Sequence, residues 1–355
     1  MTTINERQTV TLQQAAALIV ANPNNCFLLR GEPGIGKSSL TETIEELTGL
    51  VTIYLDIPNM DLGDVAMPVI DHESKTTKYY PNARFKLHLG QPVVLNFDEF
   101  TKGHDPVKNM LHPLLEVNKP RLGDVPLPEG SIRFLTGNLE DDGVGDSLLA
   151  HTQMRITEVE VSKPNAEMWL AWAADHGISP IVMAWVARNP DCLASYRDDG
   201  QENNPYIFNP KKVQGAVVTP RTLELSSNIV KNRDKVDPSA LEVALAGTAG
   251  PAFASSFSHF LQYHKTMTPW SEIMDTPLTA KLPDSDGAAA VMVFGAVERI
   301  KDDKEMTAFM QYIRRMDEEF QVLFCIRMAR NPSKQGFIFK CAEFAKWAAE
   351  NQDLI

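Results

Sequence analysis

The stretch that decides the fold is Gly31-Glu32-Pro33-Gly34-Ile35-Gly36-Lys37-Ser38, which fulfils every fixed position of the Walker A pattern. A short apolar run at residues 26–29 precedes it, and a helical pattern at residues 37–47 follows. A strand that ends in a glycine-rich turn before a helix directs backbone N–H groups and the helix N-terminus at one anion. The sequence therefore predicts a phosphate-binding loop. A glycine turn that merely joins a strand to a helix is the weaker alternative.

The loop divides the expected contacts with a nucleoside triphosphate among its residues. Lys37 is expected to reach the β- and γ-phosphates, and the Ser38 hydroxyl to ligate Mg²⁺. The predicted nucleotide-binding residues are Gly31, Pro33, Gly34, Ile35, Gly36, Lys37, Ser38 and Ser39.

A mostly apolar run, Val93-Val94-Leu95-Asn96-Phe97-Asp98-Glu99, ends in two consecutive carboxylates and fits the Walker B pattern. Asp98 is expected to hold Mg²⁺, and Glu99 to orient or deprotonate an attacking water. Asn96 departs from an all-apolar strand, and nothing in the sequence explains it. Alone, such a run is more often a plain strand terminus, but together with the phosphate loop it indicates triphosphate hydrolysis.

The next apolar run ends in Thr136-Gly137-Asn138. Ligands of parallel α/β sheets bind at the carboxyl ends of the strands. Asn138 is therefore a candidate for contacting the attacking water and the γ-phosphate. The alternative is that Gly137 and Asn138 only form a turn.

The composition is that of an ordinary soluble globular protein, with 43% hydrophobic and 23% charged residues among 355. Lys and Arg number 34 against 46 Asp and Glu, a net charge of −12. This balance disfavours a protein whose main surface grips nucleic acid, because that surface needs clustered cations. A local basic pore stays compatible with it.

The four cysteines show no C-x-x-C spacing, so we expect reduced packing residues and neither disulfides nor zinc ligands. No apolar run approaches the roughly 20 residues of a membrane span, and the polar start is not a signal peptide. A cytoplasmic protein without a membrane span is expected.

Three sections are predicted along the chain. Residues 1–162 alternate strands and helices, which predicts a parallel sheet covered by helices. Residues 163–266 carry apolar positions at helical spacing and predict an all-helical section. Residues 267–355 begin with a Pro- and Asp-rich stretch, 267–286, that is expected to be an extended connection. The expected strands lie at residues 26–29, 51–56, 93–98, 132–136 and 156–161.

Four helices are predicted in the last section, at residues 288–300, 305–315, 318–330 and 337–350. They are amphipathic, and none carries a nucleophile, a metal cluster or a phosphate cradle. We expect a partner or assembly element whose apolar faces are buried on the preceding helical section or on another chain.

The order and spacing of these motifs, with Arg155 just before a strand and Thr219-Pro220-Arg221 opening a helix, resemble those of AAA+ ATPases. Within that class the chain is most similar to the MoxR branch, through Asp61-Leu62-Gly63, Thr219-Pro220-Arg221 and Ala246-Gly247-Thr248-Ala249-Gly250. The resemblance covers about residues 8–265. It implies an α/β P-loop core with a parallel sheet in an αβα arrangement, a helical lid, and here a further helical C-terminal section.

The resemblance also assigns two arginines. Arg155 matches the arginine finger that reaches a nucleotide bound by a neighbouring subunit, although Arg121 or Arg133 are alternatives. Arg221 matches the lid arginine that contacts the γ-phosphate of its own subunit. Without the resemblance, Arg155 is a surface arginine and Arg221 follows a good helix start.

The connection at residues 58–90 is too long for an ordinary strand link, and residues 69–80 predict a hairpin with a polar tip. MoxR-like proteins carry a pore-facing insertion here, which implies that Lys75, Lys78, Tyr79 and Tyr80 touch a substrate. An ordinary solvated hairpin explains the pattern equally well.

The resemblance implies an ATPase that uses ATP and Mg²⁺, assembles as a homo-hexameric ring and remodels or matures a protein partner in a chaperone-like way. It also implies a partner with a von Willebrand factor A domain. One alternative is a nucleic-acid-associated AAA+ motor or loader, or a GTP-using restriction-type relative. Nucleic acid is not favoured because of the acidic balance. A second alternative is a non-hydrolytic assembly module stabilised by nucleotide, against which intact Asp98 and Glu99 speak.

Overall fold

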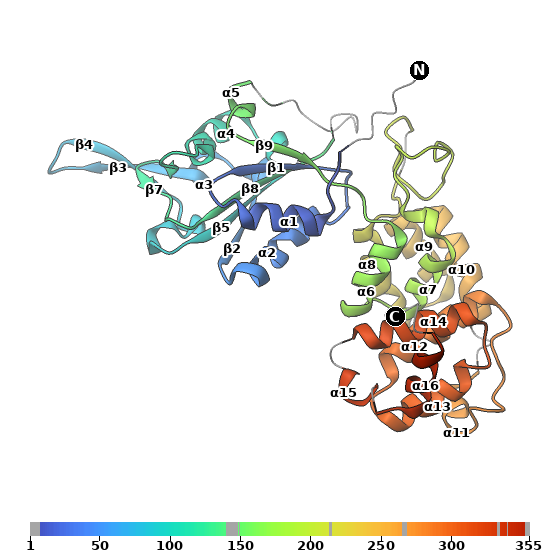
Figure 1. Ribbon diagram of the computed structural model, residues 1–355. Coiled ribbons are helices and arrows are strands. Elements are labelled where there is room, and N and C mark those ends of the chain that lie inside the picture. The colour runs from blue at the N-terminus through green and yellow to red at the C-terminus, as the bar shows by residue number, and fades with distance from the viewer. Residues whose placement is uncertain are drawn as a thin grey trace, which may run out of the picture. The chain divides into compact units, whose positions relative to one another are not determined.

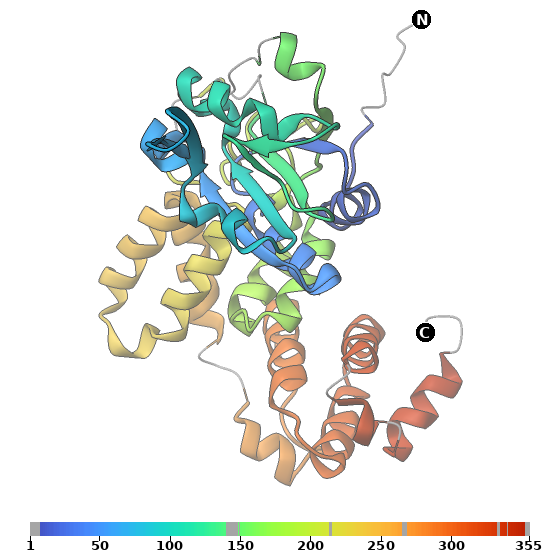
Figure 2. The same ribbon diagram turned by 90° about the vertical axis from the view of Figure 1, so that its left-hand side faces the viewer.

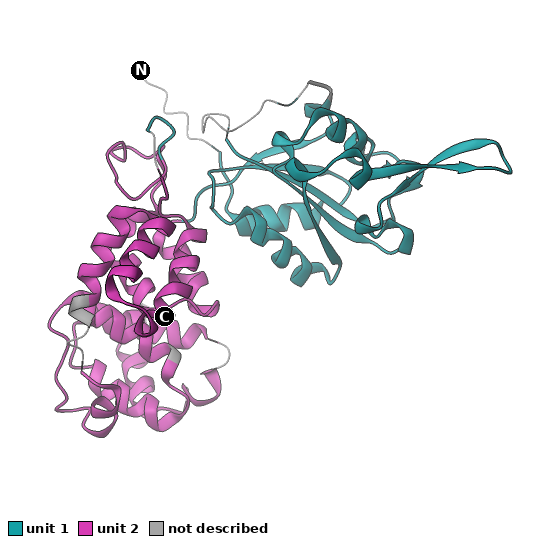
Figure 3. Cartoon of the chain, turned by 180° about the vertical axis from the view of Figure 1, so that it is seen from behind, with its two compact units in different colours: residues 1–164, 209–213 teal, residues 165–208, 214–355 magenta. Residues whose placement is uncertain are grey.

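The structure is a computed structural model that describes residues 8–139, 148, 150–212, 215–264, 268–331, 334–338 and 340–351. The chain divides into two units, shown in different colours in Figure 3. Unit 1 comprises Met1–Pro164 and Asn209–Val213, and unit 2 comprises Asn165–Phe208 and Gln214–Ile355. Each unit has its own hydrophobic core.

Unit 1 is built on a five-stranded sheet in which all neighbouring strands run parallel (Figure 1). The strand order is β2-β5-β8-β1-β9, so the strand that leads into the phosphate loop lies between β8 and β9. The parallel sheet expected from the sequence is confirmed. Its strands are β1 (Cys26–Arg30), β2 (Val51–Asp56), β5 (Val93–Asp98), β8 (Ile132–Gly137) and β9 (Thr157–Glu160).

Helices cover both faces of this sheet, which makes unit 1 a three-layered αβα structure (Figure 1). Side chains alternate along each strand. Phe27 and Leu29 of β1 therefore join the cluster of α1 and α2, whereas Cys26 and Leu28 join that of α4. The helices of unit 1 are α1 (Leu12–Ala21), α2 (Leu40–Thr48), α3 (Leu62–Val65), α4 (Asp105–Leu111) and α5 (Ala150–Gln153).

The helix after the phosphate loop begins differently from its prediction. Lys37–Ser39 form a 3-10 turn, and the α-helix proper starts at Leu40. It ends at Thr48 and is capped by Gly49, whose φ of 67° is the left-handed conformation that commonly terminates helices. The tighter first turn follows directly on Gly36, which is also left-handed.

Two antiparallel hairpins extend unit 1 beyond the sheet (Figure 1). The first consists of β3 (Ala66–Asp71) and β4 (Thr76–Pro81), which confirms the predicted hairpin. Its side chains are exposed on both faces, from Met67 to Ile70 and from Thr76 to Tyr80. The second consists of β6 (Arg121–Leu122) and β7 (Val125–Pro126).

A backbone clamp joins the two hairpins. The Asp124 N–H donates to Tyr79 O at 2.9 Å, and the Tyr79 N–H donates to Asp124 Oδ2 at 2.7 Å. Gly123 makes this approach possible, since its φ is +56° and a Cβ there would lie 2.4 Å from Tyr79 O. No local pattern in the sequence connects these two segments.

The regular secondary structure in the described residues of unit 2 is entirely helical. Its centre is α7, in which every residue from Ile181 to Val186 is buried. Figure 2 shows α9 and α10 as an adjacent pair. The helices are α6 (Ala166–Asp175), α7 (Pro180–Arg188), α8 (Pro220–Lys231), α9 (Pro238–Ala249), α10 (Pro251–His264), α11 (Trp270–Asp275), α12 (Asp286–Arg299), α13 (Asp303–Ile313), α14 (Glu318–Arg330), α15 (Gln335–Ile338) and α16 (Ala342–Glu350).

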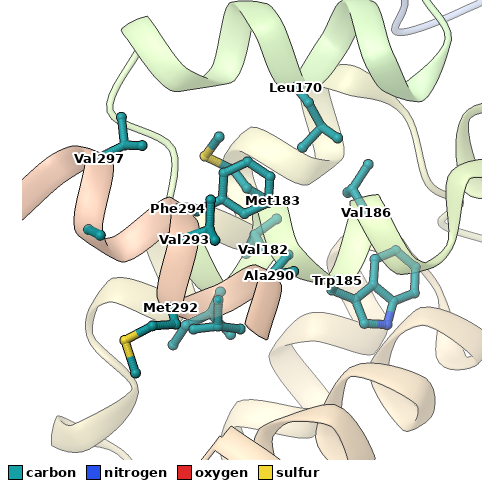
Figure 4. Packing of buried hydrophobic residues seen from close by; sticks show 14 of the residues in the cluster. Leu170, Val182, Met183, Trp185, Val186, Ala290, Met292, Val293, Phe294 and Val297 are labelled. Atoms are coloured by element: carbon teal, nitrogen blue, oxygen red, sulfur yellow. The ribbon is translucent and has the colours of Figure 1, made fainter. Parts of the chain in front are cut away.

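The two helical sections predicted from the sequence share one hydrophobic cluster. α12 packs on α7, so that Val293 and Phe294 lie among Val182, Met183 and Leu170 (Figure 4). The apolar faces of the last section are thus buried on the preceding helices, one of the two outcomes expected. The domain boundaries predicted near residues 162 and 266 stay predictions.

The extended connection predicted for residues 267–286 is wrong in its middle, because α11 occupies Trp270–Asp275. Pro269 supplies its N-cap position, and Ile273 is fully buried. Trp270 stacks on Phe309 of α13 with ring centroids 5.5 Å apart. Tertiary packing therefore stabilises this short helix, although so short a segment gives only a weak periodic pattern in the sequence.

All four cysteines are buried thiols, in agreement with the expectation of reduced packing residues. Burial raises the pKa of Cys26 to about 12, and it also raises the pKa of Cys325. Both side chains therefore stay protonated at neutral pH. Across the described ranges, no helix is long and apolar enough to cross a membrane.

Replacing Gly123 tests the clamp between the hairpins. In Gly123→Ala the new methyl group meets Tyr79 O, so the two bonds to Asp124 should open. Trypsin should cleave after Lys75 and Lys78 about tenfold faster, since that factor corresponds to about 1.4 kcal/mol of local stability. Limited proteolysis read by mass spectrometry measures the rate.

Gly90→Ala is the matched control, because Gly90 has a φ of +64° and open space where the new methyl group would lie. It carries the backbone strain without the collision. Equal cleavage rates in the hairpin for both variants would contradict the clamp.

Candidate functional site

The glycines of the phosphate loop disfavour side chains, two of them through their backbone conformation and one through lack of space. Gly34 and Gly36 have φ values of 74° and 103°, in the region that favours glycine. A Cβ at Gly31 would lie 2.6 Å from Ile35 Cδ1 and 3.0 Å from Val161 O. The loop is therefore a tight cradle of backbone, as a phosphate site requires.

The Lys37 ammonium is held inside this cradle. Its Nζ donates to Gly31 O at 2.6 Å, to Glu32 O at 3.0 Å and to Asn138 Oδ1 at 3.2 Å. The contact with Asn138 brings together two residues that lie 101 positions apart in the sequence. Three oxygens around one partly buried cation mark a place where phosphate oxygens are also favoured.

The other predicted loop residues take graded positions. Ile35 is buried, Pro33 and Ser38 are half-buried, and Ser38 lies in the 3-10 turn behind Lys37. The exposed Ser39 donates its hydroxyl to Gly36 O at 2.7 Å. Ser39 thereby supports the backbone of the loop.

A carboxylate within the loop is compensated by a cation. Glu32 is 5% exposed, and its Oε2 lies 3.9 Å from Lys163 Nζ, whose side chain is 3% exposed. A buried carboxylate beside a phosphate site is costly unless a cation balances it. Neither Glu32 nor Lys163 was assigned a role from the sequence.

Asp98 is oriented by two hydroxyl groups that were not predicted from the sequence. Tyr54 donates to Asp98 Oδ2 at 2.6 Å, and Thr136 donates to Asp98 Oδ1 at 2.5 Å. Tyr54 lies on β2 and Thr136 on β8, the two neighbours of β5 in the sheet. The only local signal for Thr136 was its place two residues before Asn138.

Glu99 directly follows β5 and leaves its extended backbone conformation. Its φ of 49° and ψ of 37° lie in the left-handed region, a backbone conformation that residues other than glycine rarely adopt. The Glu99 N–H donates to Thr136 Oγ1 at 3.0 Å, and Glu99 Oε1 lies 2.8 Å from Lys102 Nζ. Backbone strain at such a residue accompanies functional sites, and here it separates the directions of two adjacent carboxylates.

The structure explains the polar residue within the apolar strand β5. Asn96 is fully buried, and its Nδ2 donates to Thr41 Oγ1 of α2 at 2.8 Å. This bond ties the strand that carries Asp98 to the helix that follows the phosphate loop. Asn96 thus fixes one half of the site relative to the other.

The arginines predicted to act on phosphate lie in different settings. Arg155 stands between α5 and β9 with 37% of its side chain exposed, and its Nε is 3.9 Å from Glu116 Oε1. Arg133 is excluded as an alternative arginine finger, because it is 2% exposed and donates to Glu116 O and Asn24 O. Arg121 is exposed on β6. Arg221 is exposed near the start of α8 in unit 2.

The residues present suit a magnesium nucleotide. Mg²⁺ is usually bound by one or two protein oxygens together with substrate phosphates and water. Ser38 would supply a hydroxyl, and Asp98, already oriented by two donors, would supply a carboxylate. Lys37 and the loop N–H groups would receive the phosphates.

Comparison with known proteins agrees with this geometry. Residues 26–127 match the AAA domain of the dynein-related subfamily. The sequence matches no curated protein. The match supports an AAA domain within residues 26–127.

Two solved structures are among those similar to the chain. One is Hsp104 with ATPγS and FITC-casein in a closed state, at 18% identity and a TM-score of 0.35; it covers 49% of this chain, which spans 37% of the Hsp104 chain. The other is a mutant of RuvB from Thermotoga maritima, at 12% identity and a TM-score of 0.35, with 76% of both chains covered.

Thr136→Val tests the hydroxyl that serves both acidic residues. The variant keeps the shape of a residue that is 1% exposed but removes the donor to Asp98 and the acceptor for the Glu99 N–H. We expect the free energy of unfolding to fall by about 1–3 kcal/mol, because two buried polar groups lose a partner. Urea unfolding followed by circular dichroism measures it.

Thr101→Val is the matched control. Thr101 is also 1% exposed and lies against Gly137, and its Oγ1 has no hydrogen-bond partner within the described part of the chain. This variant should unfold within about 0.5 kcal/mol of wild type or be more stable. If the free energy of unfolding falls equally in both variants, the cost of Thr136→Val comes from a change in shape and not from the lost hydrogen bonds.

Proposed function

We propose that this protein is a Mg²⁺-dependent ATPase of the AAA+ class that works as an oligomeric ring of MoxR type. The observation that carries the proposal is the hydrogen bond between Lys37 Nζ and Asn138 Oδ1 inside the glycine cradle. It joins the phosphate-binding lysine to the end of β8, next to β5, which ends at Asp98 just before Glu99. Binding and hydrolytic groups therefore meet at one edge of the sheet.

Each residue has a distinct role in this proposal. Lys37 binds the β- and γ-phosphates, and Ser38 with Asp98 holds the magnesium ion that neutralises phosphate charge when bound. Glu99 orients or deprotonates the attacking water. For that step it must leave Lys102, with which it pairs at 2.8 Å in this structure. Asn138 contacts the γ-phosphate and the water.

Two arginines complete the proposed site. Arg155 acts on the nucleotide of a neighbouring subunit and cancels transition-state charge, an effect of about 10³ to 10⁵ in rate for related phosphoryl transfer. Its partly exposed side chain is compatible with that role. Arg221 contacts the γ-phosphate of its own subunit from the helical lid. A homo-hexamer is the proposed form of the ring.

The proposed task is the remodelling or maturation of a protein partner, with a von Willebrand factor A domain as the expected partner type. The exposed hairpin β3–β4 supports this task, because the side chains of Tyr79, Tyr80, Lys75 and Lys78 are all exposed on it. The net charge of −12 weighs against a nucleic-acid motor. Stimulation of ATP turnover by DNA or RNA, and not by protein, would favour that alternative.

Separate losses of binding and turnover test the two halves of the site. Lys37→Ala should weaken ATP binding at least about 100-fold, because it removes the cation that meets the phosphates. Glu99→Gln should bind ATP as wild type does and turn it over at least about 100-fold more slowly. Titration with a fluorescent ATP analogue and phosphate release measure the two quantities. Equal loss of binding in both variants would contradict these roles.

Mixing of subunits tests the action of Arg155 in trans. Arg155→Ala and Glu99→Gln subunits should each be inactive alone, yet regain activity when co-assembled, because mixed rings contain interfaces with both groups intact. Arg121→Ala is the matched control and should stay active by itself. Absence of recovered activity, once mixed oligomers are demonstrated by mass spectrometry, would rule out the finger.

A further inference from the structure

A buried arginine stands where β1 enters the phosphate loop. Arg30 is the last residue of β1 and is 3% exposed. Its backbone is aligned with Gly137 of β8 on one side and Glu160 of β9 on the other. A buried guanidinium is costly unless its charge and its N–H groups are satisfied, so its contacts are informative.

The Arg30 side chain connects the two strands that flank β1. Its Nε lies 2.6 Å from Glu158 Oε1 of β9, and its Nη1 donates to Asn138 O, just past β8, at 3.2 Å. Glu158 balances the charge, and its side chain is 46% exposed. The guanidinium therefore donates one hydrogen bond to the Asn138 carbonyl and pairs its charge with Glu158 at the same time.

Asn138 needs such an anchor. The parallel pairing of β1 with β8 ends at Arg30 and Gly137, so the sheet ladder does not hold the Asn138 carbonyl. Asn138 is 7% exposed, and its side chain accepts a hydrogen bond from Lys37. Displacement of a reacting contact by about 1 Å can cost about 100-fold in rate. Whatever fixes this backbone therefore controls the amide.

We propose that Arg30 is a positioning residue that holds the Asn138 backbone, and thereby aims the Asn138 amide at Lys37 and the γ-phosphate. The inference rests on the proposed ATPase function for its kinetic consequence. Arg30 acts on the reaction through Asn138 and Glu158 acts through Arg30. Neither residue is assigned a contact with the nucleotide.

Arg133 provides a matched control for Arg30. It is a second buried arginine, 2% exposed, in the neighbouring strand β8, and it also donates to backbone carbonyls, those of Glu116 and Asn24. Arg133 is the second residue of β8, whereas Asn138 follows its last residue. Arg→Lys at either position keeps the charge and removes the forked donors of the guanidinium.

The kinetic test compares Arg30→Lys with Arg133→Lys. Arg30→Lys should lower kcat for ATP about tenfold, equivalent to about 1.4 kcal/mol in activation free energy, and leave the Kd of a fluorescent ATP analogue within about twofold. Arg133→Lys should keep the wild-type kcat. Equal kcat for the two variants would overturn the proposal.

A double-mutant cycle with Asn138→Ala tests whether Arg30 acts through Asn138. In the Asn138→Ala background, Arg30→Lys should cost less than about twofold in kcat, because the amide that Arg30 aims is absent. If the kcat losses of Arg30→Lys and Asn138→Ala multiply in the double variant, Arg30 acts by another route and the proposal is overturned. Glu158→Gln should lose kcat about threefold, and this loss should also vanish in the Asn138→Ala background. If Arg30→Lys fails to fold, Glu158→Gln takes its place in the double-mutant cycle.

A structural readout separates this proposal from the proposed function. In crystal structures of Arg30→Lys, or of Glu158→Gln if the former does not fold, Asn138 Oδ1 should have left Lys37 Nζ, whereas Arg133→Lys should retain the bond. A retained bond in the Arg30 or Glu158 variant overturns the proposal whether or not the protein hydrolyses ATP. If the wild-type protein does not turn over ATP but Arg30→Lys still displaces Asn138, only the proposed function is refuted.

Discussion

The parallel register of β1 between β8 and β9 is the constraint on which the site depends. It aligns Arg30 with Gly137 and with Glu160, so the residues that follow β1 and β8 emerge at the same edge of the sheet. Gly31 opens the phosphate loop there, and Asn138 comes within 3.2 Å of Lys37. A shift by one residue in either pairing would turn each side chain to the other face.

Hydroxyl and amide groups complete what the register begins. Thr136 serves Asp98 and the Glu99 backbone at once, while Asn96 reaches across to Thr41 of α2. These bonds are buried or partly buried, and an unmatched polar group there would cost free energy. The polar residues within the strands therefore fix the acidic pair relative to the phosphate loop, and the apolar ones hold the helices on the sheet.

Unit 2 shows a different relation between sequence and structure. Its helical character was predicted from periodicity, but the sequence indicated two separate helical sections where the described residues share one hydrophobic cluster. α12 lies on α7, and the cluster runs on through Phe309 and Trp347. Pro and Asp indicate a loop locally, yet the burial of Ile273 and the stacking of Trp270 order one short helix within it.

The sequence by itself determined the five parallel strands, a hairpin at residues 69–80, the phosphate loop, and the candidate roles of Lys37, Asp98, Glu99 and Asn138. These features are carried by contiguous residues whose spacing and apolar pattern are local. Tertiary structure alone decided that Tyr54, Thr136 and Arg30 reach the site, that Arg133 does not, and that Asp124 joins two hairpins. Each of these contacts joins residues from different elements, and only the register of the sheet and the burial of each side chain select it.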